Sequence, residues 1–169
     1  MIDNEKIAIL TSGGDSPGMN AAIRSAAKIA MSKGIKVYGI QRGYLGMLND
    51  EIFPMDDRFV SGIIDRGGTR LLTARCLEFK DPKFRAIAAH NLKKREIEGI
   101  VVIGGDGSYR GADALSKEHG IKVVGIPGTI DNDIKGTDLL LGLIHVLILF
   151  LMLYQKSEIQ LLLMRELFL

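Results

Sequence analysis

Short apolar runs that end in glycine-rich loops recur along the first 138 residues, and helical patterns follow most of the loops. These runs predict strands over 7–10, 37–40, 99–103 and 122–126. The intervening patterns predict helices over 19–33, over 81–95, and in a stretch that ends at 117. Pro82 suits a first helical position, and Gly34 and Gly120 suit helix stops. The alternation predicts an α/β fold, in which helices cover both faces of a parallel sheet.

Three of the loops carry residues that suit phosphate chemistry. They span 11–18, 104–108 and 127–133, and each combines glycine with a carboxylate or a hydroxyl. Glycine lets backbone N–H groups approach phosphate oxygens closely, and a following helix N-terminus adds partial positive charge. Carboxylates would repel a bare phosphate, so they indicate Mg²⁺ or proton transfer. Glycine and aspartate also form ordinary tight turns, but three loops at one sheet edge favour a binding site.

Composition narrows the remaining function classes. The 169 residues suffice for one domain, and the net charge of +2 argues against nucleic acid or an anionic membrane as the main partner. The single cysteine, Cys76, excludes an intrachain disulfide and fits a reducing, cytoplasmic setting. The first six residues lack the basic-then-apolar layout of a secretion signal.

The composition changes abruptly after Asp138. Residues 139–154 contain no Asp, Glu, Lys or Arg, and leucine dominates them. A membrane-spanning helix needs about 20 apolar residues, whereas this run is shorter and is interrupted by Gly142 and His145. We therefore expect no membrane partner, although a membrane anchor is the alternative if the tail is genuine.

The loops, in their order, resemble the successive signatures of the phosphofructokinase family, of the bacterial ATP-dependent type. The matching segments are Thr11-Ser12-Gly13-Gly14-Asp15-Ser16-Pro17-Gly18-Met19-Asn20, Gly43-Tyr44-Leu45-Gly46, Arg66-Gly67-Gly68-Thr69, Gly104-Gly105-Asp106-Gly107-Ser108 and Pro127-Gly128-Thr129-Ile130-Asp131-Asn132-Asp133. A GGDG loop alone is shared with NAD and diacylglycerol kinases, but the ordered set is specific. The resemblance covers 1–138 and implies an incomplete Rossmann-like domain.

The resemblance implies transfer of the γ-phosphoryl group of ATP to the 1-hydroxyl of fructose 6-phosphate, a glycolytic step that requires Mg²⁺. Asp131 resembles the general base, and Thr129 and Ile130 would join it in sugar binding; an Asx turn is the alternative for Asp131. Asp106 resembles the Mg²⁺ carboxylate, with a helix N-cap as the alternative or additional role. The implied ATP contacts are Gly14, Arg75, Cys76, Gly105, Asp106, Gly107 and Ser108.

Two of these assignments have plain alternatives. Arg75 would otherwise form a surface ion pair. Cys76 is expected to contribute packing and backbone contacts and not a nucleophile, because direct transfer needs no covalent step.

Two glycines indicate the phosphoryl donor. The pyrophosphate-dependent branch of the family has Asp where this chain has Gly107, and Lys where it has Gly128. A side chain at 107 would add bulk and negative charge where the α-phosphate of a nucleotide needs room. The resemblance at both positions is to the ATP users.

Basic residues early in the chain resemble an effector site for ADP or phosphoenolpyruvate. Arg24, Lys28 and Arg58 lie at comparable positions, although Lys28 replaces the usual Arg and loses bidentate phosphate recognition. A solvated helix face is the alternative. The resemblance also implies a homotetrameric parent enzyme.

The resemblance ends after Asp138, and a one-base shift of the reading frame explains why. If one base was lost just after the codon for Asp138, back-translation of 139–169 permits a family-like continuation that begins Phe-Thr-Ile-Gly-Phe and includes Ser-Ser-His-Glu-Arg. We therefore divide the chain into an incomplete nucleotide-binding and catalytic domain, 1–138, and an aberrant apolar tail, 139–169. Kinase activity is then expected of the parent protein, and the alternative for this chain is a non-catalytic fragment that at most binds nucleotide.

Overall fold

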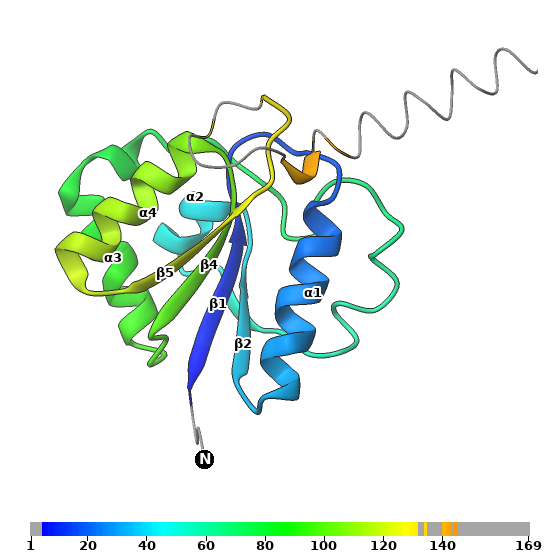
Figure 1. Cartoon of the computed structure of the whole chain (residues 1–169). Helices are drawn as coiled ribbons and strands as arrows, with labels where there is room; N and C mark the ends of the chain where they lie inside the picture. Colours follow the sequence, from blue (N-terminus) through cyan, green and yellow to red (C-terminus); the bar gives the residue numbers. More distant parts are fainter. Residues whose placement is uncertain (1–4, 132–133, 135–139, 143, 145–169) are drawn as a thin grey trace, which may run out of the picture.

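A mostly parallel, five-stranded sheet forms the centre of the protein (Figure 1). The computed structural model describes residues 5–131, 134, 140–142 and 144. The strand order is β3-β2-β1-β4-β5. The strands are β1 (Lys6–Thr11), β2 (Lys36–Ile40), β3 (Ile52–Pro54), β4 (Gly99–Gly104) and β5 (Lys122–Pro127). The helices are α1 (Met19–Ser32), α2 (Gly43–Leu48), α3 (Pro82–Lys93) and α4 (Asp106–His119), with a 3-10 turn η1 (Glu78–Lys80).

The four strands predicted from apolar runs are confirmed, and β1, β2, β4 and β5 pair in parallel. The sequence analysis did not predict β3, which pairs antiparallel with β2. β3 has three residues and ends in Pro54, so it is too short to show the alternation of apolar and polar residues that is typical of a strand. Proline is tolerated there because β3 lies at the edge of the sheet, where one side of the strand needs no ladder donor.

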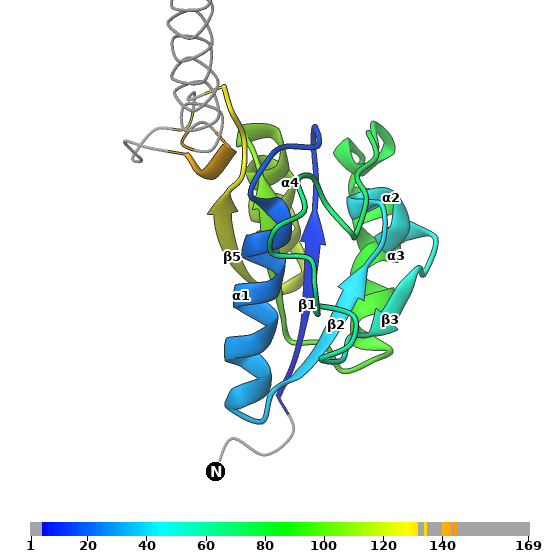
Figure 2. The same ribbon diagram turned by 90° about the vertical axis from the view of Figure 1, so that its right-hand side faces the viewer.

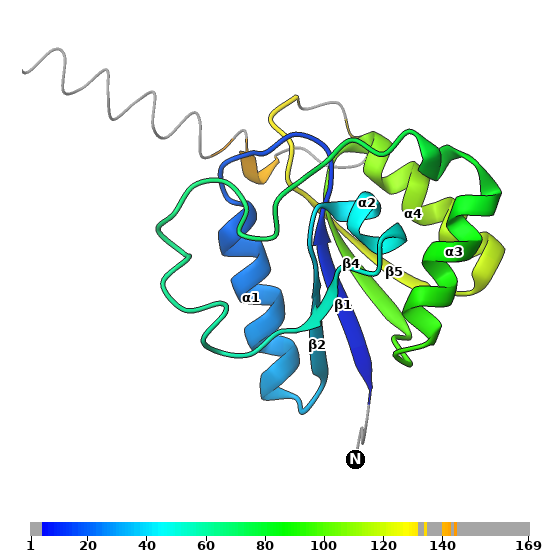
Figure 3. The ribbon, with the colours of Figure 1, turned by 180° about the vertical axis from the view of Figure 1, so that it is seen from behind.

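Helices lie on both faces of the sheet, as predicted. Figures 1 and 2 show α1 on one side and α2, α3 and α4 on the other. Alternate residues of the central strands enter two separate cores: Ala8 and Leu10 face α2 to α4, whereas Ile9 faces α1. Seen from behind in Figure 3, the long segment between β3 and η1 runs beside α1 and returns to the same end of the sheet as the loops.

The helix ends follow the expected chemistry. The Asp81 carboxylate accepts a hydrogen bond of 2.9 Å from the amide of Lys83, and Pro82 occupies the first position of α3. Gly120 ends α4 in the left-handed conformation, with φ of 73°. Glycine adopts this conformation without the steric cost that a Cβ atom brings.

One part of the sheet has no helix over it among the described residues. α1 packs on β1, β2 and β4, and next to it Ile7, Val101 and Val124 line a shallow apolar groove of about 240 Å³. Val124 on the edge strand β5 is 60% exposed. Parallel sheets are normally covered on both faces, and within the described residues this part of the face has no cover.

The predictions for 139–169 concern residues that lie almost entirely outside the described part of the chain. Within the described residues, no helix combines the length and apolar character that crossing a membrane requires.

The two sides of the sheet should respond differently to truncation. Leu10 is fully buried, so Leu10→Ala should lower the free energy of unfolding by about 2–5 kcal/mol. Val124→Ala removes a largely exposed side chain and should change the free energy of unfolding by less than about 0.5 kcal/mol. Urea unfolding of the 169-residue chain measures both values. An equal cost for the two variants would show that the face at Val124 is covered.

Candidate active site

The register of the parallel strands brings the three predicted loops to one edge of the sheet. Thr11 at the end of β1 pairs with Ile103 of β4, and Gly104 pairs with Pro127 of β5. Two backbone hydrogen bonds of 3.0 Å extend the ladder into the loops, from Ser12 N to the Ile103 carbonyl and from Gly128 N to the Gly104 carbonyl. Since parallel strands end together, their loops must meet.

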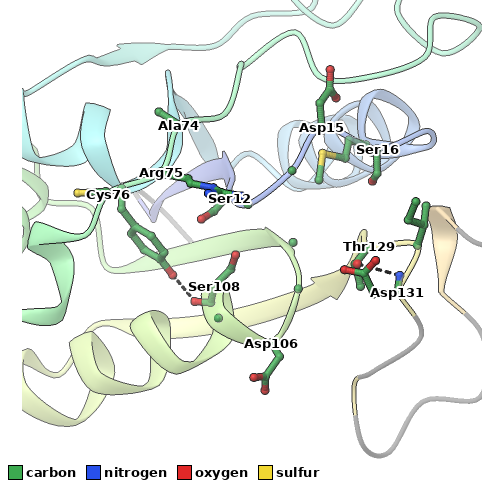
Figure 4. A pocket seen from close by; sticks show the side chains of 18 of the residues that line it. Ser12, Asp15, Ser16, Ala74, Arg75, Cys76, Asp106, Ser108, Thr129 and Asp131 are labelled. Carbon is green, nitrogen blue, oxygen red and sulfur yellow. Dashed lines mark hydrogen bonds between the residues drawn. The ribbon is translucent and has the colours of Figure 1, made fainter.

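These loops surround an open cavity of about 550 Å³, shown from close by in Figure 4. Each sugar- and ATP-binding residue predicted from the sequence contributes to its lining. These residues are Gly14, Arg75, Cys76, Gly105, Asp106, Gly107, Ser108, Thr129, Ile130 and Asp131. The cavity thus gathers residues that are more than 100 positions apart in the chain.

The second loop leads directly into α4, so that the first turn of this helix borders the cavity. Gly105 is the N-cap, and no side chain caps the helix. The N-cap role considered for Asp106 is therefore wrong, because Asp106 is the first helical residue. Its carboxylate pairs with Arg110 at 2.8 Å, on a surface where such a pair contributes little and exchanges readily. Ser108 N donates to the Gly105 carbonyl at 3.0 Å, whereas the N–H groups of Asp106 and Gly107 come too early in the helix to have an intrahelical acceptor and can meet an anion.

The third loop presents Asp131 at the rim of the cavity. The amide of Asp131 donates to Thr129 Oγ1 at 3.1 Å, so the threonine hydroxyl organises the turn into the aspartate. Asp131 is exposed, and Figure 4 shows it opposite the residues of the first two loops. The Asx-turn alternative for Asp131 involves residues 132 and 133, which lie outside the described part of the chain.

Residues 74–77 form a further wall, which is anchored to the first loop and to α1. Thr11 Oγ1 donates to the carbonyl of Leu72 at 2.9 Å, and the side-chain amide of Asn20 donates to the carbonyl of Arg66 at 3.0 Å. Arg75 reaches the cavity, and no carboxylate among the described residues pairs with it. Burial raises the pKa of the Cys76 thiol, which keeps it protonated and argues against a nucleophilic role.

Tyr44 is a site residue whose role the sequence analysis did not predict, although its segment belonged to the matching motifs. Its ring stacks on Phe79, with the ring centres 4.0 Å apart, and its hydroxyl donates to the carbonyl of Ser108. Burial raises the pKa of Tyr44 far above its ordinary value, so the hydroxyl stays a donor. The two rings line a second hollow of about 460 Å³, which shares Cys76 and Gly107 with the main cavity.

The predicted effector residues do not line the main cavity. Arg24 and Lys28 lie on α1, and Arg58 is exposed in the loop after β3. Arg24 donates to the carbonyl of Val60 at 2.6 Å, and Lys28 pairs with Asp57 at 2.9 Å. Both cations therefore already have partners on the neighbouring loop.

Two glycines of the second loop should differ in their tolerance of a side chain. A Cβ atom at Gly104 would lie 2.5 Å from the Ser12 carbonyl oxygen and 2.7 Å from Ser108 Oγ, whereas at Gly107 it would meet nothing within 4 Å. Gly104→Ala should cost about 1–3 kcal/mol of stability, because the backbone must shift. Gly107→Ala should be neutral or stabilise the helix by up to about 1 kcal/mol. Denaturant unfolding of both variants checks this, and equal costs would contradict the loop packing described above.

Comparisons with known proteins agree with this geometry. The family model described as "Phosphofructokinase" matches residues 6–147. An ATP-dependent 6-phosphofructokinase of Fusobacterium nucleatum subsp. nucleatum is 76% identical over 138 residues, which are 82% of this chain and 43% of that protein. One from Yersinia enterocolitica is 58% identical over 138 residues, 82% of this chain and 42% of that protein.

Solved structures show the same fold. The Pichia pastoris phosphofructokinase in the T-state matches with a TM-score of 0.78 and 39% identity, over 84% of this chain and 17% of that chain. The Saccharomyces cerevisiae phosphofructokinase matches with a TM-score of 0.83 and 36% identity, over 91% of this chain and 24% of that chain. This protein spans less than half the length of the curated relatives that it matches. From the family model and these relatives, the chain belongs to the phosphofructokinase family.

Proposed function

We propose that the parent of this chain transfers the γ-phosphoryl group of ATP to fructose 6-phosphate, giving fructose 1,6-bisphosphate. The observation that carries the proposal is the convergence of three strand-end loops on one cavity, with Asp106 and Asp131 on separate loops of its lining. Phosphoryl transfer needs donors around the phosphates, a charge-neutralising metal and a group that orients the attacking hydroxyl. The loops offer residues for each of these tasks.

Asp106 fits a magnesium ion that is held partly by substrate. Mg²⁺ is usually bound through one or two carboxylates together with phosphate oxygens, and it needs no cage made only of protein groups. Asp106 is half-exposed in the first turn of α4, which borders the cavity, and this position suits such an arrangement. The ion, when bound, would neutralise charge on the β- and γ-phosphates. Gly14, Gly105 and Ser108 would hold phosphate oxygens through backbone and hydroxyl donors.

Asp131 would accept the proton of the sugar 1-hydroxyl as that oxygen attacks phosphorus. Its position at the rim leaves it accessible to a substrate, and Thr129 orients the turn that carries it. Thr129 and Ile130 would seat the sugar beside it. No covalent intermediate is required, because the hydroxyl oxygen attacks the γ-phosphorus as the bond to ADP breaks.

The nucleotide would extend from the phosphate loops toward residues 74–77. Arg75 supplies a cation to the main cavity, and the aromatic pair Tyr44 and Phe79 lines the adjoining hollow. A flat apolar surface beside a phosphate site suits a nucleoside base. Cys76 borders both spaces and would contribute packing.

The space around Gly107 supports a nucleotide as donor. Nothing lies within 4 Å of the place where a side chain would begin, so an α-phosphate has room there. Gly128 is different, because a Cβ atom there would lie 3.0 Å from Ile103 Cγ2. A lysine at 128 would therefore require either the Ile103 side chain or the third loop to shift slightly.

We further propose that 1–138 is the beginning of a longer catalytic protein and that 139–169 arises from a one-base frameshift. The uncovered groove beside α1 supports this division, because a complete parallel sheet would have a covering element there. The shifted frame after Asp138 permits apolar residues three or four positions apart, the pattern of a helix with one apolar face. By contrast, residues 139–154 as given contain no Asp, Glu, Lys or Arg that could form the polar face of such a helix. The fragment itself would then bind nucleotide at most.

The remaining expectations belong to the parent as well. We propose a cytoplasmic homotetramer, with ADP or phosphoenolpyruvate as effectors at Arg24, Lys28 and Arg58. The partners of Arg24 and Lys28 would have to exchange for phosphate oxygens when such an effector binds.

The donor assay tests the proposed activity. The protein with one base restored after codon 138 should phosphorylate fructose 6-phosphate faster with ATP than with pyrophosphate at equal concentration. Gly107→Asp should lower turnover with ATP at least about tenfold, because it places a negative charge beside the phosphates. Ala86→Asp adds the same charge on the exposed side of α3 and should have little effect. Faster turnover of the parent with pyrophosphate would overturn the donor assignment.

The two carboxylates should have separable kinetic effects in the restored protein. Asp131→Ser should lower kcat by about 10²–10⁴ while ATP binding stays nearly unchanged, because a general base acts in the transition state. Asp106→Ala should instead raise the Mg²⁺ concentration needed for half-maximal rate. Steady-state kinetics with varied ATP and Mg²⁺ measure both effects. If Asp131→Ser raises the KM for ATP and leaves kcat within a few-fold, the base is misassigned and Asp133 becomes the next candidate.

A further inference from the structure

Ser16 makes a contact between the first and third loops that the sheet does not provide. It lies in the loop between β1 and α1, and it is 6% exposed. Its hydroxyl donates a hydrogen bond to the backbone carbonyl of Gly128, at a sequence separation of 112 residues. Figure 4 shows Ser16 on the side of the pocket that faces Thr129.

This contact differs in kind from the other links between the loops. The backbone bonds described above join loops of neighbouring strands, from β1 to β4 and from β4 to β5. β1 and β5 are not neighbours, because β4 lies between them. The spacing between their loops is therefore set only indirectly by the ladder, and the Ser16 side chain supplies a direct restraint.

The restraint acts on the residues that would carry the two halves of the reaction. Gly14, two positions before Ser16, belongs to the loop that would hold the phosphates of the donor. Thr129 is the residue after Gly128. Its Oγ1 accepts a hydrogen bond from the amide of Asp131 and so fixes the turn that leads to the general base. A shift of Gly128 would be passed to Asp131 through this short stretch of backbone.

We propose that Ser16 is a positioning residue, which sets the distance between the donor phosphates and the base at Asp131. The proposal rests on the proposed function for its kinetic consequence. Ser16 lines the cavity, but only 6% of the residue is exposed and its hydroxyl is directed to the Gly128 carbonyl, so its polar contact lies within the protein. It therefore acts on the alignment of bound reactants and not on their affinity.

The test compares Ser16→Ala with Ser32→Ala in the protein of restored length. Ser32 is the control for loss of a serine hydroxyl, since it also donates to a backbone carbonyl, that of Ile29 at 2.8 Å, but it is exposed and lies at the far end of α1. Ser16→Ala should lower kcat by about 10- to 100-fold, as misalignment of reacting groups does, while the KM values for ATP and fructose 6-phosphate stay within threefold. Ser32→Ala should leave all three values unchanged.

Hydrogen exchange provides a readout that does not depend on activity. In Ser16→Ala, amides of the peptide 127–131 should exchange about three- to tenfold faster, whereas those of β1 and β4 keep their protection. A kcat within threefold of the parent, a rise in either KM that accounts for the loss, or unchanged exchange at 127–131 would each overturn the proposal. If the restored protein has no kinase activity at all, the proposed function fails, and the exchange comparison alone decides whether Ser16 restrains the third loop.

Discussion

The parallel pairing of β1, β4 and β5 is the constraint on which the rest of the site depends. It places Thr11, Gly104 and Pro127 at one edge of the sheet, so three loops that are far apart in the chain must share one space. Parallel strands in which alternate residues are buried on opposite faces hold this register firmly, since a slip by one residue would exchange the two cores. The chemistry of the cavity is therefore a consequence of hydrophobic burial some distance below it.

The loops need additional contacts, because a sheet fixes strand ends but not the segments beyond them. Backbone bonds continue the ladder into Ser12 and Gly128, the Tyr44 hydroxyl holds the carbonyl of Ser108, and Thr11 and Asn20 secure the segment that leads to Arg75. Most of these groups are buried. A buried polar group that lost its partner would be costly, so each contact favours a single arrangement of the cavity.

Local pattern and motif order predicted the strands, the helices and the residues that line the cavity. Strong apolar runs next to glycine are informative because burial and turn geometry act within a few residues. The three-residue strand β3 and the short helix α2 were not predicted, since neither is long enough to show a periodic pattern of apolar residues. The N-cap role of Asp106 was misjudged by one position, because Gly105 takes the cap. Contacts across the fold, such as Ser16 with Gly128 and Tyr44 with Ser108, could not be predicted, since no local pattern encodes which distant carbonyl a hydroxyl will meet.

The proposed division of the chain also bears on an exposed apolar face of the sheet. Val124 is 60% exposed on a face that parallel sheets normally cover, and the chain matches only 43% of the length of its relative from F. nucleatum. The identity to that relative extends over 138 residues, and the family model extends to residue 147. The proposed change of reading frame would account for the exposed face and the partial length with one event, whereas a membrane anchor would account only for the apolar tail.

The nucleotide sequence of the locus around codon 138 tests this account most directly. Independent resequencing followed by translation of both frames is the measurement. We expect that one restored base joins 1–138 to a continuous reading frame of family-like sequence, long enough to complete the length of the curated relatives. A confirmed sequence with no family-like frame downstream would contradict the account, because the apolar tail would then be the genuine end of the protein.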